Sequence, residues 1–175
     1  VRSRGLGDVY KRQVGGKTES LRRELESTRR RESNVNSLYR FSSRIAAVDD
    51  AVTIMEEFVS HVGRELQRTV LILLPESKVL RLQACYAVQQ EDAAAEFQLP
   101  PSEYAVAAWV QEHGQAAGRS TDTLPGAENL FLPLMNGEKV IGVVGIAIDT
   151  RKLSPEERAV LGAWVSLLAI ALVRA

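Results

Sequence analysis

The chain has 175 residues, 45% of them hydrophobic, so it is long enough to bury one substantial core. Its 22 basic residues balance 22 acidic ones, which argues against a nucleic-acid binder, because such proteins present a basic surface to the phosphates. A single cysteine, Cys85, excludes an intrachain disulfide and any metal site built from several cysteines.

The N-terminal segment VRSRGLGDVYKRQ is basic and shows the period of neither a helix nor a strand. It resembles translated adapter sequence rather than part of a fold. We therefore expect residues 1–16 to be a non-native or disordered leader, and the fold is predicted without the first 13.

Residues 17–48 form the next segment, and they contain neither Gly nor Pro. Their apolar residues recur at steps of three, four and seven, which predicts a long helix with a thin apolar seam. A small domain cannot bury the early turns of such a helix, so we expect it to meet a second copy of itself. A solvated charged helix or a frayed tail is the alternative. The seam residues are Leu21, Leu25, Val35, Leu38, Ile45 and Val48.

Asp49 or Asp50 can cap a second helix that ends near Leu66. Its expected apolar stripe consists of Val52, Met55, Phe58, Val59, Val62 and Leu66. His61 lies off this stripe, between two glutamates and with no second metal ligand nearby in the sequence, so we expect a solvated histidine.

The segments TVLILLP and VLRLQACYA, joined by a short polar turn, predict a β-hairpin. In the second strand, Leu80 to Tyr86 alternate between an apolar face and a mixed face that holds Arg81, Gln83 and Cys85. Cys85 on the mixed face is either a thiol that looks into a cavity or a half-buried thiol without chemistry.

A helix is expected from Pro101 or Ser102 to His113, because Gly114 supplies a stop. His113 in its last turn favours the helix dipole when protonated. Trp109 shares a face with two valines and is expected in the core.

The polar segment 119–128 leads into a second hairpin, NLFLPLM and KVIGVVGIAID, around Asn136 and Gly137. The second of these strands is apolar at almost every position, which predicts a central strand. Pro133 places the first strand near an edge or a bulge.

SPEE is a capping box that opens a last helix with Ser154 as its cap. The apolar run AVLGAWVSLLAIALV within it is shorter than the roughly 17 to 25 residues of a membrane-spanning helix. Apolar residues surround the helix, so we expect it to touch its own sheet and, in addition, either the first helix or the copy of this helix in a partner chain. The residues predicted for the dimerising and relaying helices are Leu21, Leu25, Val35, Leu38, Leu161, Trp164 and Leu168.

The predicted fold is therefore α+β, with a central antiparallel sheet. Long N- and C-terminal helices pack on one face, and the Trp109 helix and the polar loop cover a cleft on the other. No nucleophile with a base, carboxylate pair or metal-ligand cluster stands out, so the sequence predicts no catalytic residue, no metal and no cofactor.

The order of these elements, and above all the second hairpin and the last helix, resembles a GAF domain. The segments RRRESNVNSLYRFSSRIAAVDD and AAGRSTDTLPGAENLFLPL are similar to the cytoplasmic GAF domain of the KdpD family of potassium-responsive sensor histidine kinases. That family's loop reads approximately Ala-Gly-x-Gly-Thr-Asp-Thr-Leu-Pro, and here Ser120 replaces the usual second glycine.

The resemblance implies a regulatory module, with residues 17–48 as the signalling helix and 49–175 as the GAF domain. It would lie in the cytoplasmic part of an inner-membrane protein, between transmembrane segments and a kinase core, and would relay potassium or osmotic signals as a helical homodimer. No phosphoacceptor box or nucleotide lid is present, so the chain is not predicted to be an enzyme.

Two other classes remain open. The first is a sensor of a nucleotide or other small metabolite, whose candidate ligand-binding residues are Arg119, Thr121, Asp122, Thr123, Arg81 and Cys85. In the competing interpretation the loop residues satisfy their own backbone. The second class is a GAF-fold methionine sulfoxide reductase, which works through several cysteines and is disfavoured by the single cysteine here.

Overall fold

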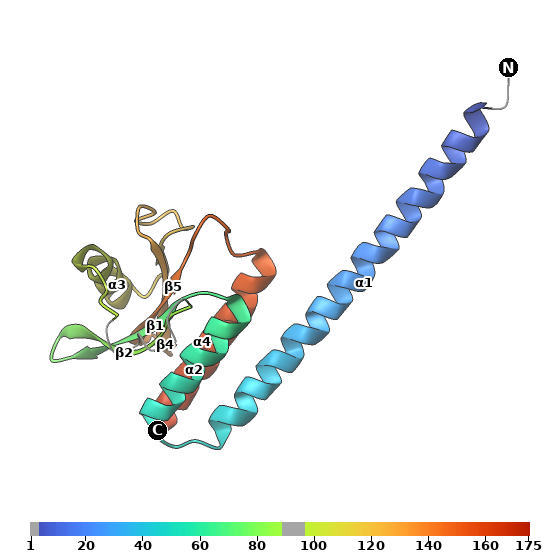
Figure 1. Cartoon of the computed structure of the whole chain (residues 1–175). Helices are drawn as coiled ribbons and strands as arrows, with labels where there is room; N and C mark the ends of the chain where they lie inside the picture. The colour runs from blue at the N-terminus through green and yellow to red at the C-terminus, as the bar shows by residue number, and fades with distance from the viewer. Residues whose placement is uncertain (1–3, 89–96) are drawn as a thin grey trace. The chain divides into compact units, whose positions relative to one another are not determined.

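The computed structural model describes residues 4–88 and 97–175, with side chains from residue 11 onward. The chain divides into two compact units, Val1–Tyr39 and Arg40–Ala175. Helix α1 (Arg4–Ala46), drawn in blue in Figure 1, supplies the described part of the first unit, and its last turns belong to the second.

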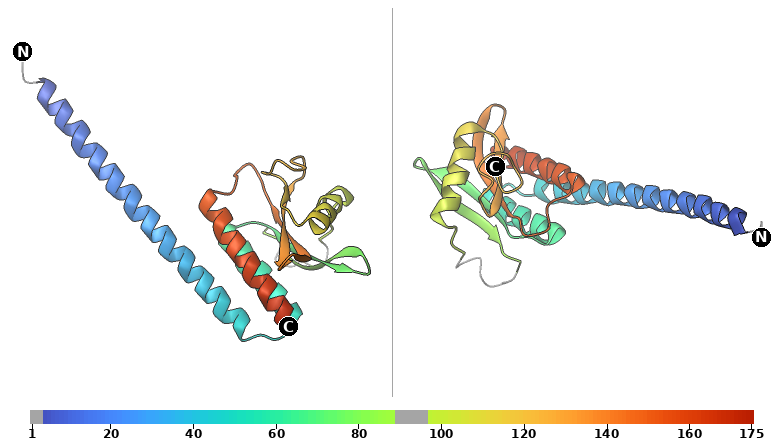
Figure 2. Two further views of the ribbon diagram at one scale, coloured as in Figure 1. Left: turned by 180° about the vertical axis from the view of Figure 1, so that it is seen from behind. Right: turned by 90° about the horizontal axis from the view of Figure 1, so that it is seen from above.

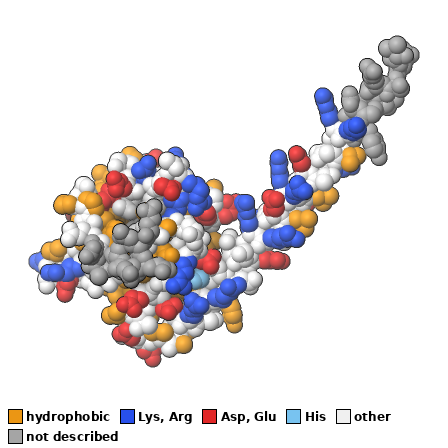
Figure 3. Space-filling view, in the orientation of Figure 1, with side chains coloured by type: hydrophobic (Ala, Val, Ile, Leu, Met, Phe, Trp, Pro, Cys, Tyr) orange, Lys and Arg blue, Asp and Glu red, His pale blue; other side chains and the backbone are white. Residues whose placement is uncertain are grey.

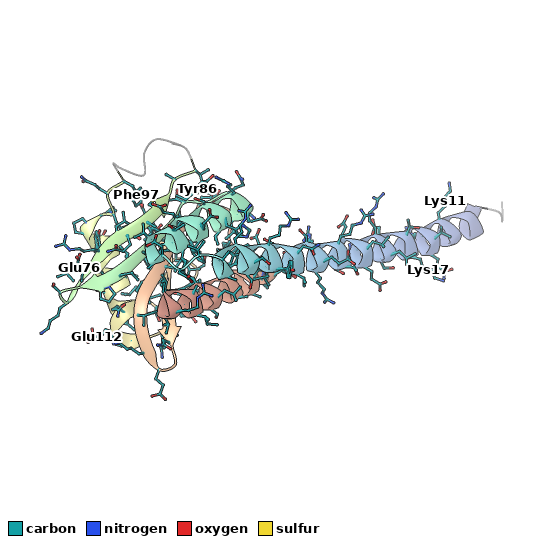
Figure 4. All side chains as sticks on the ribbon, turned by 90° about the horizontal axis from the view of Figure 1, so that it is seen from below. Lys11, Lys17, Glu76, Tyr86, Phe97 and Glu112 are labelled. Atoms are coloured by element: carbon teal, nitrogen blue, oxygen red, sulfur yellow. The ribbon has the colours of Figure 1, made fainter. Side chains whose placement is uncertain are left out.

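In the first unit, every side chain from residue 11 to residue 33 is exposed to solvent. Charged and apolar side chains are interspersed along this stretch (Figure 3), and Lys11 and Lys17 project from the helix (Figure 4). The helix begins at Arg4, so residues 4–16 are helical and not disordered, as the leader was expected to be. A formed helix gains one hydrogen bond per added residue, and each of the four glycines in α1 costs only about 1 kcal/mol. The non-native origin of the leader stays a prediction.

Five strands of the second unit form one antiparallel sheet in the order β2-β1-β5-β4-β3. They are β1 (Val70–Glu76), β2 (Val79–Tyr86), β3 (Ala117–Gly118), β4 (Asn129–Asn136) and β5 (Lys139–Ala147). Both predicted hairpins are confirmed. β5 is the central strand, as its apolar run predicts. Pro133 lies beyond the two residues of β4 that pair with β3, where β4 forms the edge of the sheet.

Helices α2 (Ala51–Leu66) and α4 (Pro155–Arg174) lie side by side over one face of this sheet (Figures 1 and 2). Both predicted caps are present. The carboxylate of Asp50 accepts a hydrogen bond from the amide of Thr53 at 2.8 Å. The hydroxyl of Ser154 accepts one from the amide of Glu157 at 3.1 Å, and the Glu157 carboxylate accepts the amide of Ser154 at 3.0 Å.

The apolar stripe of α2 is confirmed except at its start. Val52 is 53% exposed, whereas Ile54, absent from the predicted stripe, is fully buried. The first turn of the helix faces solvent at Val52, whereas Phe58, one turn after Ile54, packs edge-on against Phe41 of α1. The buried residues of α2 are Ile54, Met55, Phe58, Val59, Val62, Gly63 and Leu66.

Helix α3 (Pro101–His113) covers the other face of the sheet, as predicted. The space between α3 and the sheet is filled by a buried apolar cluster, called here the cleft core. Its members are Leu71, Leu73, Leu80, Leu99, Val106, Ala107, Val110, Ala117, Ala127, Phe131 and Val143. Trp109 packs partly against this cluster, and His113 stacks on Trp109 with ring centroids 4.1 Å apart. The α+β architecture is thus the predicted one.

The predicted strict alternation of side chains along β2 is wrong after Leu82, because the strand contains a bulge. Ile72 pairs with Ala84 and Leu73 with Leu82, so Gln83 is an additional residue in the strand. Beyond the bulge the side chains exchange faces. Tyr86, labelled in Figure 4, lies against α2, where a Cβ on Gly63 would stand 2.0 Å from its ring.

Candidate functional site

The loop from Arg119 to Glu128 is organised by the hydroxyl of Thr121. That oxygen lies 2.7 Å from the carbonyl oxygens of both Gly118 and Thr123, to one of which it donates, and it accepts the amide of Thr123 at 3.2 Å. The amide of Gly118 also donates to the carbonyl of Thr123, at 2.8 Å. Asp122 is exposed. The loop therefore satisfies much of its own backbone, which leaves Thr121 little capacity for a ligand.

Ser120 shows why the family pattern has a glycine here. Its φ is 67°, in the left-handed region that costs a residue with a Cβ roughly 1 to 2 kcal/mol. Its hydroxyl is buried and has no hydrogen-bond partner among the described residues. Its carbonyl accepts a hydrogen bond from Arg158 of α4 at 3.2 Å. The serine keeps the backbone of the loop while introducing some strain.

Glu103 is the residue that fastens α3 to this loop. The side chain is buried, yet its carboxylate accepts the amides of Glu128 at 2.9 Å and Asn129 at 3.1 Å. The side-chain amide of Asn129 donates to it at 2.7 Å. Nothing in the sequence indicates this role, because a glutamate in the first turn of a helix is usually exposed and interacts with the helix dipole.

Cys85 is half-buried and packs against the cleft core, away from the mixed face predicted for it with Arg81 and Gln83. The bulge at Gln83 causes this change of face. Burial raises the pKa of the Cys85 thiol to about 11, so the thiol stays protonated at neutral pH. Arg81 forms an ion pair with Glu76 at 2.8 Å, and both side chains are exposed.

Two of the grooves in the described part of the chain bear on the predicted ligand site. Arg119 lines one of about 440 Å³ together with Thr69, Asn129 and Asp149. A second, apolar groove of about 750 Å³ runs between the β1–β2 hairpin and the outer side of α3, near Tyr104. Of the six residues predicted to bind a ligand, Arg119 lines the first groove and none lines the second. The structure thus does not bring the six together.

The described residues make more specific contacts where the helices meet than they do around the two grooves. The ring of Phe41, in the last turns of α1, stacks on the imidazole of His61 of α2 with centroids 5.3 Å apart and planes 18° apart. Trp164 of α4 meets the same imidazole edge-on at 5.4 Å. We call these three residues the aromatic junction. His61 is half-buried, so the expectation of a solvated histidine is wrong.

Arg174, at the end of α4, joins the end of α1 to the end of α4. Its guanidinium donates to the carbonyl of Ile45 at 3.0 Å and to that of Val48 at 2.9 Å. It also lies 3.9 Å from the Asp49 carboxylate. The last carbonyls of a helix have no partner within the helix, so a cation placed there satisfies them and the negative end of the dipole. A basic residue in a last turn is the only sequence signal for this contact.

Arg68 makes a second link, between the end of α2 and the start of α4. Its side chain is buried and donates to the carbonyl of Ala147 at 3.1 Å and to Asp149 at 3.3 Å, and also to the carbonyl of Arg151. Asp149 in turn accepts the amide of Arg151, and this bond, followed by the nearby Arg68 cation, lowers the pKa of the Asp149 carboxyl. The connection before α4 is therefore held in one conformation.

The predicted dimer residues fall into two groups. Leu21, Leu25 and Val35 are at least 60% exposed, and Leu38 is partly buried. Leu161, Trp164 and Leu168 are buried within the single chain, so they are core residues and not a free surface. After the first turns of α4, its exposed positions include Gly162, Ser166, Ile170 and Val173, which follow one another at helical spacing.

Among the side chains that the structure describes, residues 11–88 and 97–175, there is no cluster of three or more His, Cys, Asp or Glu that could hold a metal ion. None of the helices in that same range is long and apolar enough to cross a bilayer.

Comparison with known proteins gives one consistent result. A family model described as the GAF domain matches residues 51–174. The chain is 29% identical over 166 residues to the sensor protein KdpD of Escherichia coli strain K12, and 24% identical over 161 residues to that of Clostridium acetobutylicum. Each alignment covers 92% of this chain but only 17% and 18% of the relatives, so the chain spans less than a fifth of their length.

Solved structures agree with this result. The crystal structure of the GAF domain of the potassium sensor histidine kinase KdpD from Escherichia coli is 28% identical, with a TM-score of 0.63 over 79% of this chain and 92% of that chain. The free methionine-R-sulfoxide reductase of Staphylococcus aureus has a TM-score of 0.60 at 16% identity, over 79% of this chain and 95% of that chain. The second likeness is one of fold alone.

Proposed function

The chain belongs to the GAF domain family, and from this premise we propose that it is the regulatory module of a membrane-bound sensor histidine kinase. In this proposal the module lies in the cytoplasm, between transmembrane segments and a kinase core, and transmits potassium or osmotic signals. The similarity to the KdpD sensor proteins supports the assignment.

One observation supports a relay more than any other. Arg174, at the end of the last helix, donates to the carbonyls of Ile45 and Val48, at the end of the first. A displacement of α1 at this point must carry α4 with it or break two charge-assisted hydrogen bonds. We infer that a signal passes from α1 to α4 directly, along the helical face of the domain.

The relay is proposed to act without chemistry of its own. The single thiol is half-buried and protonated, and the hydroxyl of Thr121 is bonded within its own loop. A reductase that works through several cysteines has no equivalent set in this sequence.

The relay is tested by shortening α1 in a full-length sensor kinase that contains the module. Removing residues 22–28 turns the preceding part of the helix by about 20° relative to the domain, because seven residues are nearly two turns. Removing residues 22–26 turns it by about 140°. We expect autophosphorylation to stay regulated after the seven-residue deletion and to be locked on or off after the five-residue one. Since the longer deletion causes the smaller rotation, equal activity in both would contradict a rotational relay.

We also propose that the module is a homodimer. The exposed apolar residues Leu21 and Leu25 of α1, and Ile170 and Val173 of α4, support this proposal, because a monomer would leave them in water. Native mass spectrometry should give the mass of two chains. Ile170→Lys combined with Val173→Lys should raise the dissociation constant tenfold or more, since each buried aliphatic side chain contributes roughly 1.5 to 3 kcal/mol. Val79→Lys, on the exposed hairpin, is the control.

The alternative function, sensing of a small anionic metabolite, is favoured by Arg119 at the rim groove beside Asn129. The same native mass spectrum distinguishes it, because protein purified from cells would then carry a bound ligand. A single-chain mass at all concentrations would instead contradict the dimer.

A further inference from the structure

The aromatic junction places a titratable ring where three helices meet. The imidazole of His61, on α2, lies between Phe41 from the last turns of α1 and Trp164 from α4. Phe41 also packs edge-on against Phe58, at 5.7 Å. Phe41 is fully buried and Trp164 is 2% exposed, so two sides of the imidazole are closed by apolar rings. A change of charge on His61 therefore occurs inside the packing that holds α1 to the domain.

The charged groups around His61 nearly balance one another. Arg40 and Arg44, on α1, oppose a proton on the imidazole, whereas Glu57 and Glu65, on α2, favour one. Arg44 and Glu57 also pair with each other at 3.7 Å. On α4 the neighbouring group is the indole of Trp164, which carries no charge. With two cations against two anions, removal of the ring from water decides its protonation.

Burial accordingly lowers the pKa of His61 below its ordinary value of 6.5. The folded junction thus favours the neutral ring. An opened junction, like the unfolded chain, would return the imidazole to water and let it take up a proton near pH 6.5. The stability from the neutral ring is complete above that pH and is lost as the pH falls through 6.5 toward the lower pKa of the folded state.

We propose that His61 makes the aromatic junction a proton-sensitive joint, in which uptake of a proton by the imidazole loosens Phe41 and Trp164 and releases the last turn of α1 from α2. Acidification would then weaken the attachment of α1 while leaving the sheet and the cleft core closed. The proposal concerns the module itself and does not depend on the relay.

The titration can be observed directly because the chain has two histidines and two tryptophans that form two separate pairs. Trp109 stacks on His113 at the surface, and Trp164 contacts His61 in the junction. Replacing Trp109 with Phe and His113 with Gln leaves only the junction pair. An imidazolium quenches indole emission more strongly than a neutral imidazole. The emission of Trp164 should therefore fall on acidification with a midpoint below pH 6.5, whereas a midpoint at or above 6.5 would overturn the proposal.

Opening is measured by hydrogen exchange of the amides of residues 41–46 at pH 7.5 and 5.5. At each pH the exchange rate of the unaltered protein is divided by that of His61→Gln. This ratio of rates removes the intrinsic pH dependence of exchange. This ratio should rise on acidification, by up to about tenfold for each unit that separates the pKa values of the closed and open states. The strands should show no such rise. A ratio that stays constant would overturn the joint, even if His61 titrates with a low midpoint.

Discussion

Replacing Glu103 with alanine should lower the free energy of unfolding by about 3 to 5 kcal/mol, because it leaves two buried donors and one partly buried donor without an acceptor. These donors are the amides of Glu128 and Asn129 and the side-chain amide of Asn129. Each buried donor that loses its partner costs roughly 1 to 3 kcal/mol. The loss also leaves a space between α3 and the loop. Urea unfolding followed by circular dichroism measures the change.

Two further variants test whether the loss of stability comes from the Glu103 carboxylate. Glu103→Gln keeps one carbonyl acceptor and the volume, so it should lose less stability than Glu103→Ala. Glu112→Ala, at an exposed position of the same helix labelled in Figure 4, should change the free energy of unfolding by less than about 0.5 kcal/mol. If Glu103→Ala behaved like Glu112→Ala, the carboxylate would contribute nothing to holding α3.

Leu161→Ala and Leu168→Ala should each lower the free energy of unfolding by about 2 to 5 kcal/mol. Both leucines are fully buried on the face of α4 that meets the sheet and α2, so the truncation removes packed methyl groups and leaves a cavity. The spread in the estimate reflects how far the neighbouring side chains can close the space.

The matched control for these leucines is Ile170→Ala on the same helix, where the isoleucine is 69% exposed. In the isolated chain at high dilution, this variant should be nearly neutral. A loss equal to that of Leu168→Ala under those conditions would mean that the assignment of core and surface on α4 is reversed. Melting curves at two protein concentrations separate this effect from dimer dissociation.

Local chemistry made several elements predictable from the sequence. The Ser154 capping box, the Asp50 cap and the Asn136-Gly137 turn each depend on residues within a few positions of one another. The all-apolar pattern of β5 likewise reports its central place, because both of its faces are covered. Such signals need no knowledge of distant partners.

The candidate site was harder to predict because its contacts join distant residues. Arg174 reaches the carbonyl of Ile45, and Glu103 reaches Asn129. An arginine that ends a helix and a glutamate that begins one look the same in sequence whether they meet water or a buried partner. The role of His61 was misjudged for the same reason, since its aromatic neighbours come from two other helices.

The side of the sheet on which Cys85 lies was predicted wrongly because β2 contains one additional residue. Strict alternation along β2 assigns it to the side of Arg81, but the bulge at Gln83 moves it to the cleft core. A period of two carries no marker for such an insertion, because the bulge depends on the pairing with β1.

The position of β5 between β1 and β4 also sets the order in which this domain can assemble. Each hairpin closes through a short turn and can form early, but the middle of the sheet requires Val70 to pair with Ile146, across most of the domain. Closing so long a stretch of chain costs conformational entropy before the central contacts compensate for it. During synthesis the first hairpin and α2 must therefore wait, with their apolar faces open, until β5 has left the ribosome. A chain cut before Lys139 would keep α1, α2, α3 and the first hairpin, but it would lack both α4 and the central strand on which the sheet closes.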